Sequence, residues 1–568
     1  DTPEAKNPAQ ELFLKIFSYW GVRLTNEELE TIIPETSEVP WVMRIIPAPL
    51  DIAGLESICK EKDLLCFFPV VDLSIVKELL KHNCPIMSSW IEEKFAPGWG
   101  SVIYNNRWSY IINGFDDSKG KIYVHIPPHK KVFEYPASTF PSIWWGGRRE
   151  NMVLLIVPAS KAQIVRKLIP KEAFEKGEAL IQLFKTERNL LSPSNTCEDR
   201  IQSIKACLEA RKKIAKMFPM WAFANHLYGY PLFMTGARKE GLNYLEKARQ
   251  LEPSLFYRLA LASAYTTAGE FKRAWKELKE CEKKGGKHSL VYLFILSYLY
   301  KKEGKVEDGI KYIRRVIESL NDKDPLKREV RQVYAFLKFE EGKPDEAMKE
   351  LSDVAERYRV STLYCLLFRL NARLGRWKEA KRVVEISGLR RESFEPEIRF
   401  AFASDINERI NILRKVSKAY YVAKHLLFAY LEAGYWKEAQ GLLASDKNTD
   451  LNFVLAIPPN YVFFGPPIHY IEAAEILTGK GIIEYQKGNK EKTKELFQRA
   501  IGYSEMPLSL FAPHLSEAIL TPRAYLGSIF YEEGEKELAR RYLKEAFSKN
   551  VPFLGYEEAK AVAKKLGL

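Results

Sequence analysis

The side chains best suited to covalent chemistry lie in the amino-terminal part of the chain. They are the thiol of Cys84 and the imidazoles of His82, His125 and His129. A thiol within hydrogen-bond distance of an imidazole can act as a nucleophile, provided that its surroundings raise the thiolate fraction. Cys84 precedes a proline in the apolar run CPIMSSWI, which is the setting of a buried and inert thiol. For this reason an active cysteine peptidase or transferase that uses Cys84 is only the alternative interpretation, not the main one.

Metal and cofactor chemistry have no recognisable motif in the sequence. The seven cysteines, at positions 59, 66, 84, 197, 207, 281 and 365, show no CxxC pair and no metal-ligand spacing, so we expect scattered buried thiols. The motifs HExxH, DxDxDG, GxxxxGKS/T and GxGxxG are also missing from the sequence. We therefore expect no metal site, no cofactor and no nucleotide chemistry.

The elements that would position these side chains form a mixed domain at residues 1–158. Helical spacing covers ELFLKIFSYW, AGLESICKEK and SIVKELLKHN. The segments CPIMSSWI, RWSYIINGF, GKIYVHIP and NMVLLIVP are short β-branched or aromatic runs bounded by turns. Helices followed mainly by strands predict an α+β fold for this domain.

The same domain resembles the papain-like cysteine peptidases that process the double-glycine leaders of bacteriocins. The similarity rests on SYWGVRLTNEELETIIP, SIVKELLKHNCPIMSSW, NNRWSYIINGFDDSKGKIYVHIPP and the closing strand MVLLIVP. In that family a cysteine at the start of the first helix is the nucleophile, a strand histidine takes its proton, and an Asn or Asp orients the histidine. The resemblance places these functions on Pro8, on Trp108 (or Arg107) and on Ile126.

None of these replacements can do the corresponding chemistry. Pro8 has no nucleophile, Trp108 cannot act as a base near neutral pH, and Ile126 cannot accept a hydrogen bond through its side chain. The resemblance therefore implies a papain-like pseudopeptidase domain rather than an enzyme. The loop SIWWGGRRE, rich in Trp and Arg, is either a recognition loop or packing against the first repeat.

After about residue 159 the pattern becomes helical and repeats itself. A small residue, a glycine seven residues later and a second small residue five residues beyond it recur along the chain. The first four spacings between the glycines are 33, 35, 38 and 33 residues, and the later gaps of 59, 54 and 46 require insertions. The glycines of this frame are Gly236, Gly269, Gly304, Gly342, Gly375, Gly434, Gly488 and Gly534.

This segment resembles an array of about eight tetratricopeptide (TPR) repeats, each a pair of helices. The glycine would end the first helix of each pair in a left-handed conformation, which costs little only without a Cβ. We expect an all-α TPR superhelix (a solenoid) at 216–568, preceded by a helical linker or cap at 159–215. Insertions rich in proline and aromatic residues are expected at 446–470 and 504–522.

The resemblance to TPR proteins implies a binding surface on the first helices of successive pairs, where peptides commonly lie. In this sequence the surface combines aromatic rings with cations, which suits an acidic or carboxylate-ended peptide. A solvated surface without a dedicated ligand stays open as the alternative. The predicted lining residues are Phe223, His226, Tyr230, Phe233, Tyr298, Lys301, Lys302, Phe336, Arg369, Arg373, Lys424 and Phe428.

The charge of the chain is uneven. The net charge of +14 divides into about −4 up to residue 160 and +18 beyond it. An excess of Lys and Arg attracts anionic partners, although Lys/Glu-rich helices also accompany thermal adaptation, which hints at a thermophilic source. Nucleic acid is disfavoured because the charges are dispersed and no nucleic-acid-binding motif accompanies them. No apolar run of about 18 residues could span a bilayer.

These observations predict a non-catalytic interaction scaffold that binds a protein or peptide, or a second copy of itself, through its repeats. The pseudopeptidase domain would be a second recognition module, and a structural subunit of a homo-oligomeric surface assembly is a further alternative. The chain begins at Asp1, so a removed leader or lipid anchor stays open. The domain combination resembles secreted or lipid-anchored bacterial proteins. We therefore expect a periplasmic or cell-surface location, with the cytoplasm as the alternative.

Overall fold

The computed structural model of the 568-residue chain contains two compact units. The first comprises Asp1–Arg188 with Lys216–Phe218, and the second comprises Asn189–Ala215 with Pro219–Leu568. The residues that the structure describes are 8–33, 51–88, 110–125, 132–136, 152–190, 197–234, 237–283, 290–322, 325–358, 363–364, 367–368, 370–371, 376–387, 405–416, 420–444, 468–504, 517–551 and 553–568.

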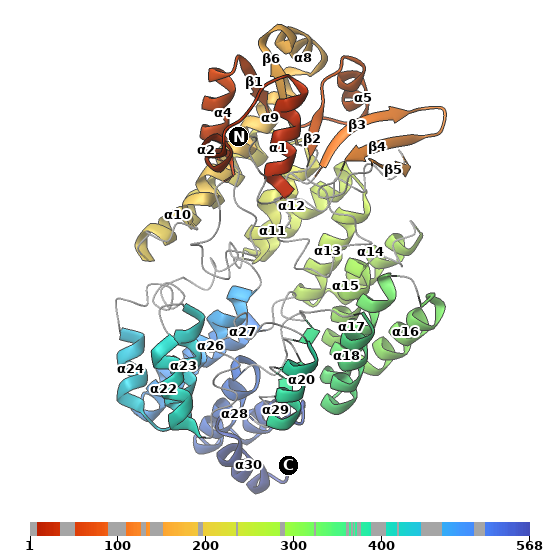
Figure 1. The fold of residues 1–568 in the computed structure, drawn as a ribbon. Helices are drawn as coiled ribbons and strands as arrows, with labels where there is room; N and C mark the ends of the chain where they lie inside the picture. The colour runs from red at the N-terminus through yellow and green to blue at the C-terminus, as the bar shows by residue number, and fades with distance from the viewer. Residues whose placement is uncertain are drawn as a thin grey trace. The chain divides into compact units, whose positions relative to one another are not determined.

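An antiparallel sheet of six strands forms the centre of the first unit (Figure 1). The strand order is β1-β6-β2-β3-β4-β5, so β6, the last strand in sequence, lies between β1 and β2. The continuous apolar run of β6 fits this inner place, because its first five residues are all buried. The strands are β1 (Leu64–Phe67), β2 (Ile86–Ser88), β3 (Tyr110–Asp116), β4 (Lys121–His125), β5 (Val132–Pro136) and β6 (Val153–Pro158).

Helices precede and follow the strands, and one helix comes between β1 and β2, so this unit is a mixture of helices and strands as the sequence pattern predicts. The Trp20 indole, just after α1, donates a hydrogen bond of 2.7 Å to the Ile156 carbonyl of β6. A capping box starts α2, because Thr25 and Glu28 bond each other's backbone N–H. The helices are α1 (Pro8–Tyr19), α2 (Asn26–Ile32), α4 (Ile52–Glu61), α5 (Leu73–Lys81), α8 (Ala162–Leu168) and α9 (Lys171–Leu190).

The first unit extends further along the chain than the predicted boundary at residue 158. The backbone N–H of Val70 donates a 3.0 Å hydrogen bond to the Ala173 carbonyl in α9. A Cβ on Gly177 of α9 would lie 1.8 Å from the Phe68 carbonyl oxygen, so only glycine permits this approach. Residues 159–188, expected as part of a linker, therefore belong to the first compact unit.

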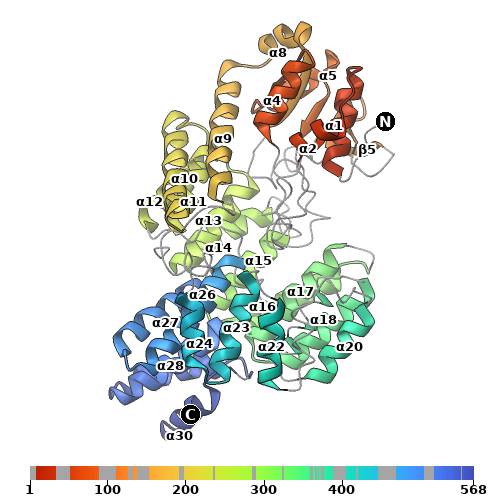
Figure 2. The ribbon, with the colours of Figure 1, turned by 60° about the vertical axis from the view of Figure 1, so that its left-hand side comes forward.

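The second unit is a succession of helix pairs joined by short turns (Figure 2). It begins with α10 (Cys197–Met217), most of which lies in this unit. The fully described pairs are α11 (Ala222–Met234) with α12 (Arg238–Leu251), α13 (Leu255–Ala268) with α14 (Phe271–Lys283), α15 (Leu290–Lys302) with α16 (Val306–Ser319), α17 (Pro325–Glu340) with α18 (Pro344–Tyr358), α23 (Tyr420–Glu432) with α24 (Trp436–Ala444), α26 (Ile468–Gln486) with α27 (Lys490–Ser504), and α28 (Glu517–Glu532) with α29 (Lys536–Phe547).

The glycine frame is confirmed wherever the structure describes it. Six frame glycines have a positive φ, between +72° and +85°, at the turn between the two helices of a pair. Gly236 and Gly375 lie outside the described residues. The six are Gly269, Gly304, Gly342, Gly434, Gly488 and Gly534.

The small residues of the frame lie where two helices approach closely. Ala262, Ala274, Ala335 and Ala347 are fully buried. At the same frame position in the last pair, a Cβ on Gly527 would lie 2.6 Å from Leu543. The helical repeat array, named here the array, is therefore built as the repeat pattern predicts.

Two features of the array differ from the expected layout. The long gap before Gly434 contains an additional helix, α22 (Ile406–Val416), which packs against α23. The predicted insertions end earlier than expected, because α26 already begins at Ile468 and α28 at Glu517. The middle of each insertion lies outside the described residues. The fifth pair is described only in part, and its second helix is α20 (Trp377–Ser387), which precedes α22. After the last pair comes α30 (Tyr556–Lys565).

Candidate functional site

The positions that match the peptidase catalytic residues are only partly described. Pro8 is the first residue of α1, the place that the family's cysteine would occupy. Trp108 and Ile126 lie outside the described residues, although their neighbours Tyr110 and His125 begin β3 and end β4. Within β3 and β4, Ile111 pairs with His125. The relationship to papain-like peptidases thus stays a prediction.

A polar contact that the sequence gave no reason to expect joins α1 to β4. Lys15 Nζ lies 2.5 Å from Nε2 of His125 and 2.8 Å from the carboxylate of Glu11. An ammonium group has only protons to donate, so Nε2 of His125 is the acceptor when Lys15 binds to it. This nitrogen cannot take a proton from a nucleophile while Lys15 remains bound to it. The Glu11 to Lys15 spacing of four residues was visible in the sequence, but the distant His125 was not.

Cys84 occupies an apolar environment rather than a reactive one. Its side chain is fully buried within the hydrophobic core of the first unit, and its thiol donates to the His82 carbonyl at 3.7 Å. Burial raises the pKa of the Cys84 thiol, and the positive charge of Lys161 only partly opposes this shift. A nucleophilic cysteine needs the opposite shift.

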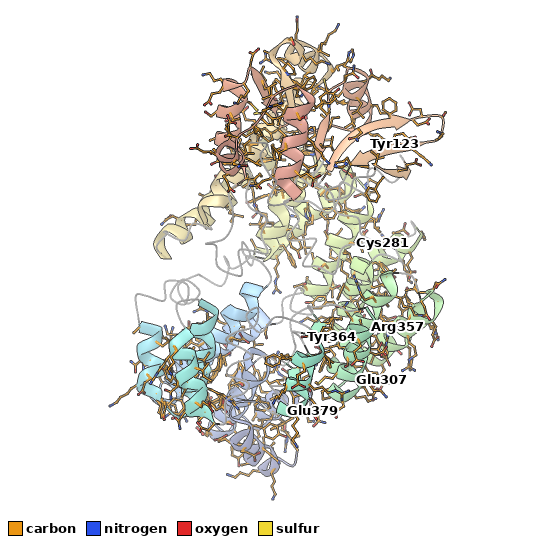
Figure 3. The ribbon with its side chains drawn as sticks, viewed as in Figure 1. Tyr123, Cys281, Glu307, Arg357, Tyr364 and Glu379 are labelled. Carbon is orange, nitrogen blue, oxygen red and sulfur yellow. The ribbon has the colours of Figure 1, made fainter. Side chains whose placement is uncertain are left out.

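Cys59, Cys66, Cys207 and Cys281 are also free thiols, and all of them except Cys66 are buried. Cys281 on α14 is an example, and its position is labelled in Figure 3. Cys59 and Cys66 differ from the scattered pattern that the sequence predicts, because their side chains hydrogen-bond to each other. Among the described residues, no three His, Cys, Asp or Glu side chains are grouped to hold a metal ion. No described helix is long and apolar enough to cross a membrane.

At four positions of the predicted aromatic lining the rings are buried in this structure. The first helix of each pair lies between its own partner and the helices of the neighbouring pair, so most of its faces are covered. Rings placed there become core residues. The four are Phe223, Phe233, Tyr298 and Phe336, none more than 8% exposed.

The remaining aromatic lining residues are His226 and Tyr230, both on α11, and the partly exposed Phe428 on α23. His226 and Tyr230 of α11 are partly exposed, and their rings lie 5.8 Å apart. The His226 ring also contacts Phe256 at 4.8 Å and Tyr257 at 5.7 Å in edge-on geometry. Although part of the residue is exposed, its Nδ1 is buried, and this burial lowers the pKa of His226 to about 3, with the positive charge of Arg211 adding to the shift. Imidazole and rings thus form a neutral aromatic surface on α11 and α13.

The two predicted cations whose side chains the structure describes are not isolated charges. Lys301 is paired with Glu340 at 3.0 Å, and Lys302 lies 5.8 Å from the centre of the Tyr298 ring. Lys424 lies on α23, whereas Arg369 and Arg373 fall outside the described residues. Sequence reasoning missed the acid that pairs with Lys301, because Glu340 lies 39 positions away in another helix pair.

Comparisons with known proteins add little to this picture. No protein-family model and no curated protein matches the sequence. Among solved structures, the chain is similar to the crystal structure of the APC/C hetero-tetramer Cut9-Hcn1, with a TM-score of 0.30 and 12% sequence identity. The match covers 72% of this chain and 66% of that one. A similarity at this level does not establish a common fold, so the repeat architecture rests on the helix pairs and glycine turns described above.

Proposed function

We propose that this chain is a non-catalytic scaffold whose array binds a protein partner. The observation that supports the proposal is the array itself, in which pair follows pair with the same glycine turn. Pairs that pack chiefly on their neighbours leave a long, continuous surface on the first helices, which suits an extended or helical segment of another protein.

The proposed contact surface runs from α11 to the end of α15. His226, Tyr230 and Phe256 offer partly exposed rings there, and Lys302 adds a cation at the last residue of α15. Rings of this kind favour apolar or aromatic side chains of a partner, and the ammonium group favours a carboxylate. A partner segment with apolar residues followed by an acidic one would fit this surface.

The first unit serves in the proposal as a second recognition module rather than as a peptidase. Three observations weigh against the peptidase alternative: a proline begins α1, Lys15 contacts Nε2 of His125, and the Cys84 thiol is buried. Each of these features works against a thiolate–imidazole pair.

Cross-linking with mass spectrometry on the native protein from its source cells tests the proposal. We expect one dominant partner, with cross-links from it to lysines near the proposed surface, such as Lys302. Links confined to copies of the chain, together with a particle mass that is a multiple of 65.6 kDa, would instead identify a homo-oligomeric subunit.

A further inference from the structure

A buried charge cluster joins two parts of the array that are far apart in sequence. Lys549, two residues after α29 ends, contacts the carboxylate of Glu340, the last residue of α17, across 209 positions. Its Nζ also lies 3.3 Å from the Glu340 carbonyl oxygen. On the other carboxylate oxygen, Glu340 accepts from Lys301 at 3.0 Å. One carboxylate therefore holds two ammonium groups from two distant segments.

The cluster is largely removed from water. The exposed fraction of the side chain is 3% for Glu340, 12% for Lys549 and 27% for Lys301. Burial lowers the pKa of Lys549, Glu340 opposes that shift, and the positive charges of Lys301 and Arg523 reinforce it. A buried ion pair gains little over its hydrated components, because the loss of solvation offsets most of the attraction. Removing either partner alone would leave the other charge buried and unpaired, so the formed contact predominates in the unaltered chain.

The backbone at the same place is shaped to receive the carboxyl-terminal segment. Gly342, which begins the turn between α17 and α18, has a φ of +80°, and a Cβ there would lie 2.6 Å from the Ser548 carbonyl oxygen. Gly488 has nearly the same φ, +81°, at the equivalent turn of another pair, but nothing lies within 4 Å of its Cβ position. Gly342 is thus required by its neighbour as well as by its own conformation.

We propose that Lys549 and Glu340 form a latch that ties the last helix pair to the α17–α18 turn, and that the array has a latched and a released form. The latch brings together one charge cluster and one glycine contact. Its release would hydrate three charged side chains and would leave each helix pair intact, because the ion pairs of the cluster join residues of different helix pairs. This inference concerns the array alone and does not require the scaffold function.

Amine acetylation read by peptide mass spectrometry tests the latch on the full chain. Lys544, an exposed residue of α29, provides an internal reference five residues before Lys549. We expect Lys549 in the unaltered chain to react on the order of a hundredfold more slowly than Lys544, because loss of a buried partner charge costs several kcal/mol. Equal reaction rates would show that the latch does not form.

Three variants complete the test. Glu340→Gln and Gly342→Ala are each expected to bring the acetylation rate of Lys549 close to that of Lys544, and to increase the radius of gyration measured by small-angle X-ray scattering. Gly488→Ala introduces the same methyl group at a matching turn and should leave Lys549 protected. Continued protection in Glu340→Gln would overturn the proposal. Faster acetylation of lysines in all helices of Gly342→Ala would also overturn the proposal, since the contact would then be needed for the fold and would not be a latch.

Discussion

His226 illustrates how its surroundings set the chemistry of one residue. The imidazole lies among the rings of Tyr230, Phe256 and Tyr257, and its Nδ1 has no hydrogen-bond partner among the described groups. Its pKa of about 3 results first from burial and second from the charge of Arg211. The folded chain therefore holds His226 neutral, whereas an unfolded chain protonates it near its usual pKa of about 6.5. Nothing in the sequence around position 226 indicates this shift, because it depends on burial against rings of α13 and on the charge of Arg211.

The first prediction follows from this difference in pKa. As the pH falls below about 6.5, His226 binds a proton in the unfolded state but not in the folded state, so the free energy of unfolding decreases. We expect His226→Phe to remove this contribution, which amounts to about 1.4 kcal/mol per pH unit. Thermal unfolding between pH 7 and pH 4 measures it. The exposed His82→Gln variant should keep the original dependence, and an unchanged slope in His226→Phe would refute the assignment.

At the scale of helices, the array uses one ion pair at equivalent places in two repeats. Arg258 of α13 pairs with Glu277 of α14 at 2.7 Å, and Arg331 of α17 pairs with Glu350 of α18. In both repeats the arginine lies eleven residues before the frame glycine and the glutamate eight residues after it. Because the spacing is equal, both ion pairs lie between the two helices of a hairpin, where they fix the register of one helix against the other.

The second prediction concerns this pair in the α13–α14 hairpin. The Glu277 side chain is 6% exposed and also lies 3.5 Å from Arg249, so Glu277→Gln leaves two sheltered arginines without their counter-charge. We expect a loss of about 3 kcal/mol in the free energy of unfolding. Glu280→Gln, on the same helix, removes an exposed pair with Lys283 and should cost less than about 0.5 kcal/mol. Denaturant unfolding compares them, and equal losses would contradict the account.

The third prediction uses two glycines within helices. A Cβ on Gly241 of α12 would lie 2.3 Å from the Phe233 backbone nitrogen, so Gly241→Ala must push α11 and α12 apart. We expect a loss of about 1–3 kcal/mol from this overpacking. Gly441 of α24 has nothing within 4 Å of its Cβ position, and Gly441→Ala should stabilise the chain by about 0.5–1 kcal/mol. Denaturant unfolding measures both variants. If Gly241→Ala raised the free energy of unfolding as Gly441→Ala is expected to, α11 and α12 would be less closely packed than described.

At the scale of the whole molecule, the features that sequence could predict are those fixed locally. The left-handed turn at Gly269 needs glycine wherever it occurs, so the frame reveals the repeat. The burial of Phe336 and Tyr298 could not be predicted in the same way, because first helices are covered on several sides and lack a clear polar face. The contact of Glu340 with Lys549 depends on how successive pairs are arranged, which no short stretch of sequence encodes.

The binding of the partner recovered by cross-linking tests the scaffold most directly. Lys302→Glu reverses a charge on the proposed surface at the end of α15, and Lys311→Glu makes the same change at an exposed position on α16 of the same hairpin. Calorimetric titration of the full chain should show at least about tenfold weaker binding for Lys302→Glu, since a charge-assisted contact contributes about 1.5–3 kcal/mol. Lys311→Glu should bind as the unaltered chain does. Unchanged binding in Lys302→Glu, or equal weakening in both variants, would contradict a partner surface on the first helices.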